Sequence, residues 1–246
     1  MLKRIKYSLS AYVLITLIFA SCKKENLFDC FKSTGDIVTE RRSIDRFTEV
    51  VCYDNINVFF EQDSFTYIDV NAGENLLPLI VTEIRGGKLI IENNNKCNWV
   101  RDFSVPINVY VHLPALRTVD TYGSGKIYSL NTLVNDTIEV NNRNTSDVEL
   151  NVAAQAIYCR QHAAYGDNKI TGNASYLYIF NLGQGYCDCS GLAVNDADVV
   201  SKTTGQTYID ACDLLHAEIS YSGNVYYRGT PAISSVITGS GKLIQF

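Results

Sequence analysis

Residues 166–187 read GDNKITGNASYLYIFNLGQGYC, and this stretch contains the pattern that decides the fold. A turn rich in Gly and Asn leads to Ile170, an alternation of apolar residues runs through Leu177 and Ile179, and a second Gly-rich turn leads to Cys187. Apolar residues at every second position are typical of a strand with one buried face. The stretch therefore predicts short strands that are joined by tight turns.

The same unit recurs along the chain from residue 120 onward. The residues that follow the turns and are expected to point inward are Ile127, Val148, Ile170, Cys187, Tyr208, Val225 and Leu243, with gaps of 21, 22, 17, 21, 17 and 18 residues. A repeat of about 20 residues indicates a solenoid, because one coil cannot bury its apolar face alone and stacked coils share a core. Each coil is expected to hold a few short strands, with Gly and Asn at the corners because they tolerate positive φ.

We therefore expect an all-β fold, a parallel β-helix whose coils contain 17–22 residues. The alternative is a β-sandwich of two antiparallel sheets. Asn-Gly and Asp-Gly hairpin signals are absent from the sequence, and the regular spacing favours the solenoid. Residues 36–246 are expected to form one domain, in which 120–246 are regular coils and 36–119 are either wider coils or a cap.

Composition excludes two classes of protein. The chain has 246 residues, of which 46% are apolar, so it is not disordered. It has 21 Lys and Arg against 26 Asp and Glu, and residues 1–21 hold three of the basic side chains and no acid, which leaves 18 − 26 = −8 for the rest. An acidic surface repels phosphate, so nucleic acid is not expected as a partner.

The N-terminus has the order of a lipoprotein signal. Basic residues 1–6 precede a 10-residue apolar run at 11–20, which is too short to span a bilayer, and Phe19-Ala20-Ser21-Cys22 follows. Two small residues before a cysteine resemble the bacterial lipobox, in which the Cys is acylated and becomes the N-terminus. We expect a signal peptide at 1–21, an acylated Cys22 that anchors the chain to the membrane, and a tether at 22–35. The alternative is an ordinary signal peptide with Cys22 a plain thiol.

The other cysteines number seven, so at least one stays free or pairs between chains. They are Cys30, Cys52, Cys97, Cys159, Cys187, Cys189 and Cys212. Cys187 and Cys189 face the same side of a strand and could share a metal. A zinc site needs about four ligands at a recognisable spacing, and no CxxC or His pair accompanies them. We expect small buried side chains with at most one disulfide, no metal and no cofactor.

A set of short motifs carries a resemblance to a known family. In order these are RFTEV at 46–50, INV at 56–58, NLL at 75–77, GGKLII at 86–91, VYVHLP at 109–114, GSG at 123–125, SGNVYYRGTP at 222–231 and GSG at 239–241. This order resembles the putative auto-transporter adhesin head, GIN domain family of Bacteroidetes lipoproteins, over about residues 37–246. The resemblance implies a right-handed parallel β-helix in an extracytoplasmic setting, with no catalytic residue to carry over. Residues 144–146 (NTS) and 183–185 (GQG) stand where GSG is usual.

Outward positions offer a candidate ligand-contact ladder. If Ile138, Ile157 and Leu177 point inward, their neighbours Glu139, Tyr158 and Tyr178 point outward, one coil apart, with a spacing of about 4.8 Å. Tyr176 and Phe180 flank Tyr178 on the same face. Exposed aromatic rings suit a sugar ring or a protein surface. The alternative is that the rings only stabilise neighbouring coils.

No catalytic constellation is present in the sequence. The pairs Asp196/Asp198 and Asp210/Asp213 are expected in turns, where solvation explains them. We therefore expect a lipid-anchored envelope protein, at the outer membrane, that is an adhesin or binding module and not an enzyme. The alternatives are a polysaccharide-processing enzyme on the same scaffold and a structural or sensory envelope component. Asp136-Thr137-Ile138 also matches the Bacteroidetes O-glycosylation pattern at Thr137.

Overall fold

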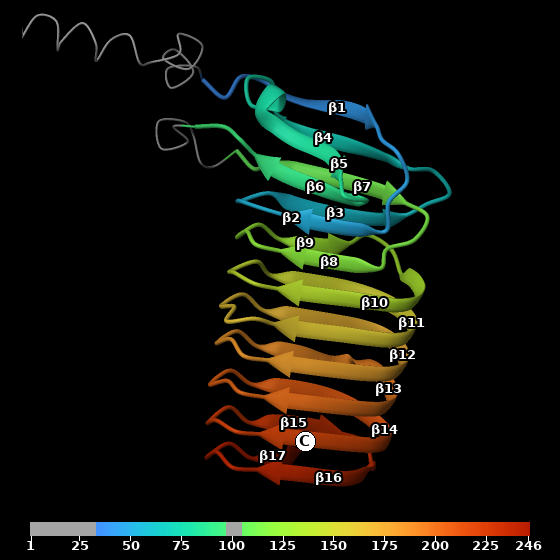
Figure 1. Ribbon diagram of the computed structural model, residues 1–246, viewed down its shortest axis with the longest axis vertical. Coiled ribbons are helices and arrows are strands. Elements are labelled where there is room, and N and C mark those ends of the chain that lie inside the picture. Colours follow the sequence, from blue (N-terminus) through green and yellow to red (C-terminus); the bar gives the residue numbers. More distant parts are fainter. Residues whose placement is uncertain (1–32, 97–104) are drawn as a thin grey trace, which may run out of the picture.

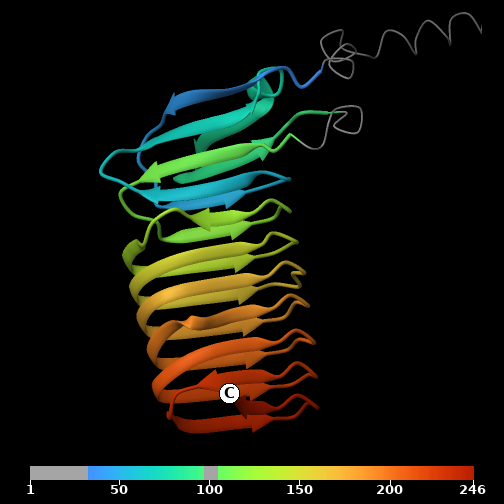
Figure 2. The same cartoon turned by 180° about the vertical axis from the view of Figure 1, so that it is seen from behind.

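The computed structural model describes residues 33–96 and 105–246, which form one 17-stranded arrangement (Figure 1). The expected signal peptide, the acylated Cys22, most of the tether, and Cys30 and Cys97 lie outside the described residues. Coils are stacked along the long axis, with tight turns along one edge and bends along the opposite edge (Figures 1 and 2). The all-β solenoid of stacked parallel coils is confirmed, and the β-sandwich alternative is not what the structure shows.

The regular coils consist of long, bent strands. They are β10 (Leu133–Asn142), β11 (Val148–Gln161), β12 (Asn168–Asn181), β13 (Cys187–Ser201) and β14 (Thr207–Ile219), each parallel to the next. The expectation of a few short strands in each coil was wrong for these coils. In β12 the buried positions change phase between Ala174 and Leu177, where the strand passes from one face of the solenoid to the other. Gly172, at φ +114°, begins this bend, so one strand can cover both faces without an intervening turn.

Shorter strands complete the coils at both ends of this stack. They are β8 (Thr118–Thr121) and β9 (Ile127–Ser129) before β10, and β15 (Val225–Arg228), β16 (Ala232–Ile237) and β17 (Leu243–Gln245) after β14. All of their pairings are parallel: β8 with β10, β9 with β11, β15 and β16 with β14, and β17 with β15. The parallel stack therefore continues to the last strand of the chain.

The N-terminal segment contains both parallel coils and antiparallel strands. It holds β1 (Ile37–Ser43), β2 (Glu49–Cys52), β3 (Asn57–Gln62), β4 (Tyr67–Gly73), the 3-10 turn η2 (Leu77–Leu79), β5 (Ile80–Arg85), β6 (Lys88–Asn93) and β7 (Asn108–Leu113). Strand β2 lies parallel between β6 and β8, and β3 lies parallel between β7 and β9. The coil at 49–62 therefore lies between the strands β6 and β7 on one side and β8 and β9 on the other, although it precedes all four in the chain. The antiparallel pairs are β1 with β4, β4 with β7 and β5 with β6, and β1, β4 and β5 lie at the N-terminal end of the stack (Figure 1).

A single apolar column runs through the coils. Ile138, Ile157 and Leu177 are fully buried and belong to one cluster that extends from Phe47 to Val225. β-Branched and aliphatic side chains at alternate positions fill the space between the two faces, and each coil contributes a layer. The inward register that the alternation predicts is therefore confirmed for these three residues. The expectation that Tyr208 points inward was wrong, because Thr207 is the buried residue that pairs with Cys187 and Val225, and Tyr208 points outward.

Buried polar side chains stack at the positions where the strands end and the turns begin. The last strand residues of five coils are polar and buried: Thr121, Asn142, Gln161, Asn181 and Ser201. The Asn142 amide donates to the Ser146 carbonyl at 2.7 Å, and the Gln161 amide donates to the Gly166 carbonyl at 2.8 Å. The Asn142 and Gln161 side chains therefore satisfy turn carbonyls that point into the core, where an unpaired carbonyl would be costly.

The turn glycines have a different role from the expected one. The turns were expected to need positive φ, but in the part of the chain that the structure describes no glycine of the GSG turns has it. A Cβ atom on Gly125 would lie 1.8 Å from the Ile56 carbonyl oxygen, and one on Gly185 would lie 2.1 Å from the Gly166 carbonyl oxygen. Glycine is therefore required because successive turns stack backbone against backbone.

Candidate functional site

The predicted tyrosine ladder lies on one outer face of the solenoid. Tyr158 of β11 is directly opposite Tyr178 of β12, and their ring centroids are 6.0 Å apart. The ring of Tyr176 meets Tyr158 edge-on at 6.1 Å. All three side chains are half-buried, so each ring leaves part of its surface to solvent while packing on its neighbours. The register that brings these tyrosines together follows from a coil of about 20 residues.

A charged pair borders the tyrosines on one side. The Arg160 guanidinium lies 4.8 Å from the ring centroid of Tyr158 and 5.7 Å from that of Tyr178. The same guanidinium donates to Glu139 Oε2 at 3.0 Å, which fixes its position over the rings. Cation–π contact and the ion pair hold this part of the face in one arrangement.

Carboxylates border the tyrosines on the other side. Asp196 pairs with Tyr176 and Asp198 pairs with Tyr178 across β12 and β13. The Tyr176 hydroxyl donates a hydrogen bond to Asp198 Oδ2 at 2.6 Å. The expectation that these aspartates lie in turns was wrong, because both lie within β13 and point outward from the same strand face. We call Glu139, Tyr158, Arg160, Tyr176, Tyr178, Asp196 and Asp198 the tyrosine–carboxylate face.

The second aspartate pair also lies in a strand. Asp210 and Asp213 both belong to β14, so their assignment to a turn was wrong as well. Asp210 Oδ2 lies 3.3 Å from the Arg228 Nε, which gives it an ion-pair partner on the next strand. Aspartate is disfavoured in strands by its propensity, and cross-strand pairing with charged or aromatic neighbours compensates here.

Tyr176 makes stability depend on pH in the alkaline range. Burial and the hydrogen bond to Asp198 raise the pKa of the Tyr176 hydroxyl above its ordinary value of 10.0. Folding therefore favours the protonated phenol. Its stabilising contribution is complete below the pKa of the unfolded chain and is lost as the pH rises toward the higher pKa of the folded protein.

We expect Tyr176→Phe to flatten the fall in unfolding free energy above about pH 10, the ordinary pKa of tyrosine. Urea unfolding at several pH values would measure the slope for the variant and the parent. Tyr165→Phe is the control, because that ring is 63% exposed in a turn and should leave the slope unchanged. Equal slopes for Tyr176→Phe and the parent would contradict the assignment.

Two other predicted site residues lie beside this face. Phe180 is half-buried and its ring contacts His162, with centroids 5.8 Å apart, so it continues the aromatic surface toward the turns. Thr137 lies in β10, half-buried, and pairs with Ala156 of β11. O-glycosylation of Thr137 stays a prediction.

The sequence reasoning missed a second aromatic column on the opposite face. Phe59 of β3 stacks on Tyr110 of β7 at 4.9 Å and on Tyr128 of β9 at 5.8 Å. Farther along the same face Tyr208 of β14 stacks on Tyr226 of β15 at 4.9 Å. The rings of Phe59, Tyr110 and Tyr128 come from three strands that are not consecutive in the chain, so only the strand pairing reveals their contact. Tyr208 and Tyr226 are 18 residues apart, and their contact could have been found from the repeat.

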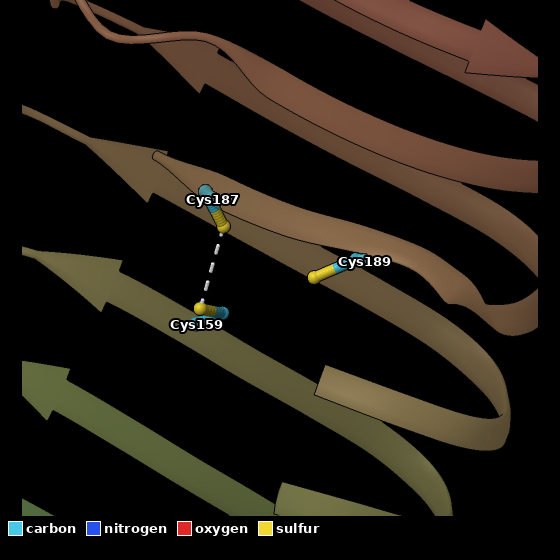
Figure 3. Close-up of side chains that lie close together, drawn as sticks. All are labelled: Cys159, Cys187 and Cys189. Atoms are coloured by element: carbon cyan, nitrogen blue, oxygen red, sulfur yellow. Dashed lines mark hydrogen bonds between the residues drawn. The ribbon is translucent and has the colours of Figure 1, made fainter. Parts of the chain in front are cut away.

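Three cysteines meet inside the core. Cys159 of β11 and Cys187 and Cys189 of β13 are fully buried, and their sulfur atoms lie within 4.8 Å of one another (Figure 3). Cys187 and Cys189 point the same way, as their spacing predicts, but Cys159 has no sequence signal that links it to them. The five cysteines that the structure describes are all free thiols.

Comparison with known proteins identifies the family. The family model described as "Putative auto-transporter adhesin, head GIN domain" matches residues 46–231. A putative adhesin from Bacteroides fragilis is 18% identical, with a TM-score of 0.82, and the match covers 87% of this chain and 100% of that one. From Parabacteroides distasonis, a putative lipid binding protein (TM-score 0.68, covering 87% and 99%) and a putative adhesin (0.67, covering 87% and 100%) are each 21% identical.

These structural likenesses show the fold, and no curated protein matches the chain. Among the described residues, no helix is long and apolar enough to cross a membrane. The family model covers most of the described residues, including every strand from β2 to β15, and it agrees with the resemblance carried by the short motifs. The chain therefore belongs to the putative auto-transporter adhesin, head GIN domain family.

Proposed function

We propose that this protein is a lipid-anchored, non-enzymatic binding module of the bacterial cell envelope, at the outer membrane, and that its ligand is a glycan. The order of basic, apolar and small residues before Cys22 supports the anchor. Membership of an adhesin family supports a place in the envelope. The tyrosine–carboxylate face carries the proposal for the ligand.

The tyrosine–carboxylate face has the two features that sugar recognition requires. Half-buried tyrosine rings offer apolar surface for the C–H side of a sugar ring, and each ring ends in a hydroxyl. Carboxylates on both sides supply acceptors for sugar hydroxyl groups, and Arg160 supplies donors. The strands repeat at about 4.8 Å, so a chain of linked sugars can follow the long axis of the solenoid.

The same geometry argues against glycoside hydrolysis at this face. Hydrolases place two carboxyl groups on opposite sides of the bond that they cleave. Asp196 and Asp198 project from one strand in the same direction, and Asp198 accepts the Tyr176 hydroxyl. A binding role needs neither a free acid nor a facing base.

We expect the double variant Tyr158→Ala/Tyr178→Ala to weaken glycan binding at least tenfold, or about 1.4 kcal/mol, because the ring platform is lost. Full-length protein in detergent would be screened on an oligosaccharide array, and affinity for a positive glycan measured by calorimetry. The matched control is Tyr208→Ala/Tyr226→Ala, which removes a stacked pair from the opposite face. Circular dichroism would check that both variants fold.

Three results would contradict the proposal. The first is a parent protein that binds no glycan but captures one protein partner at fixed stoichiometry, which favours the structural or sensory alternative. The second is equal loss of binding in both double variants. The third is cleavage of a polysaccharide that disappears in Asp196→Asn/Asp198→Asn, which favours the enzyme.

A further inference from the structure

The cysteine cluster brings three sulfur atoms together from separate parts of the chain. Cys187 and Cys189 are two residues apart in β13 and both point to its inner side, and Cys159 points to the inner side of β11. Cys159 Sγ and Cys187 Sγ are 3.6 Å apart, and all three sulfurs lie within 4.8 Å of one another (Figure 3). A cysteine can be buried here without such neighbours, as Cys52 is in β2. The cluster is therefore a specific feature of this part of the core.

Two amide side chains hold Cys159 in place inside the core. The Asn168 amide donates to Cys159 Sγ at 3.2 Å, and Asn142 holds that amide by donating to Asn168 Oδ1 at 2.9 Å. Hydrogen bonds from Cys187, Cys189 and Asn168, together with the nearby Arg160 charge, lower the pKa of Cys159. Hydrogen bonding to Cys159 and burial raise the pKa of Cys187. The Asn142–Asn168 pair thus holds a hydrogen-bond donor against the Cys159 sulfur.

We propose that Cys159, Cys187 and Cys189 form a three-coordinate site for a thiophilic metal ion, and that this ion is copper(I). Sulfur ligands select soft ions such as copper(I) and zinc. Metal–sulfur bonds of about 2.3 Å around a planar three-coordinate ion place the sulfurs about 4.0 Å apart. That separation lies between the 3.6 Å that separates Cys159 Sγ from Cys187 Sγ and the 4.8 Å within which all three sulfurs lie.

The number of ligands distinguishes copper from zinc. Zinc in structural sites takes four ligands, and within residues 33–96 and 105–246 no His, Asp, Glu or fourth Cys joins the three sulfurs. Copper(I) accepts three. Binding forms three copper–sulfur bonds as the three thiol protons pass to solvent, and the metal is neither oxidised nor reduced. The Asn168 amide, which donates to Cys159 Sγ, offsets part of the negative charge that results.

Full burial determines when the ion enters. All three sulfurs are inaccessible in the folded protein, so loading accompanies folding, and the bound ion stabilises the folded state. The test therefore begins from unfolded chain. Full-length protein is unfolded in guanidinium and reductant without oxygen, refolded with copper(I) or zinc at one equivalent, and freed of unbound metal before metal analysis.

We expect one copper(I) per chain, with sulfur neighbours in X-ray absorption and a higher melting temperature than metal-free protein. Cys159→Ala, Cys187→Ala and Cys189→Ala should each lower the copper content at least tenfold. The control variant replaces Cys30, Cys52, Cys97 and Cys212 and keeps the three cluster cysteines, and it should retain the copper. Circular dichroism separates loss of metal from failure to refold.

Other outcomes overturn the assignment. Copper that persists when all three cluster cysteines are replaced is bound elsewhere. Zinc that displaces copper from the parent protein contradicts the three-coordinate copper site. A refolded parent without metal, or a Cys159–Cys187 disulfide in protein purified from the cell envelope, shows that the cluster is not a metal site.

Discussion

Replacement of Gly125 by alanine is expected to lower the free energy of unfolding by about 3 kcal/mol or more, the upper range for overpacking. The new Cβ would lie 1.8 Å from the carbonyl oxygen of Ile56 and 2.3 Å from its carbonyl carbon. Both atoms belong to the backbone of the adjacent coil, so no side-chain rotation can relieve the contact. The two coils must separate, which breaks the parallel pairing between β3 and β9 beside the turn.

Gly191→Ala is the matched control for this substitution. Gly191 lies in β13, is exposed, and has the side-chain methyl of Thr171 as the nearest neighbour of an added Cβ, at 3.0 Å. That methyl can move, so a change within about 0.5 kcal/mol is expected. Urea unfolding followed by circular dichroism would compare the two variants. A Gly125→Ala protein as stable as the control would show that the turns do not require backbone contact between coils.

Leu177→Ala is expected to cost about 2–5 kcal/mol, because it opens a cavity in the middle of the core column. Leu177 is fully buried and belongs to the apolar cluster that joins successive coils. Neighbouring coils are held by continuous strand pairing on both sides, so they cannot collapse fully into the space. The loss should therefore exceed the transfer free energy of the removed atoms.

Leu182→Ala provides the comparison within the same coil. Leu182 follows β12 by one residue and is 44% exposed in the turn, so its loss should change stability by no more than about 0.5 kcal/mol. Thermal unfolding of both variants would measure the difference, and hydrogen exchange would show which coils open first. Similar losses in the two variants would mean that the column does not carry the stability of the solenoid.

The repeat in the sequence predicts the register of the tyrosine ladder because the coils are consecutive there. Tyr158 and Tyr178 are 20 residues apart, and the structure places them opposite each other. The same reasoning fails before residue 120, where the coil at 49–62 lies between strands that follow it in the chain. Turn geometry and alternation are local signals, and neither states which strand becomes the neighbour of another.

The site shows the same division between local pattern and strand pairing. The spacing of Cys187 and Cys189 predicts that both point inward, but Cys159 joins them only because of the way the coils stack. The contact between Tyr176 and Asp198 likewise spans 22 residues and depends on the phase change in the middle of β12. Sequence reasoning placed Asp198 in a turn, since it did not foresee strands long enough to cover both faces.

Alternation, repeat length and Gly-rich turns determined from the sequence alone that this chain is a parallel solenoid and, except at Tyr208, which residues after each turn point into its core. Those signals are local, because each depends on a few consecutive residues and on the need of one coil to bury its apolar side. The tertiary structure alone decided the order of the N-terminal coils, the backbone contacts that require glycine, and the meeting of three thiols. These features depend on the distance between separate coils, which no single coil specifies.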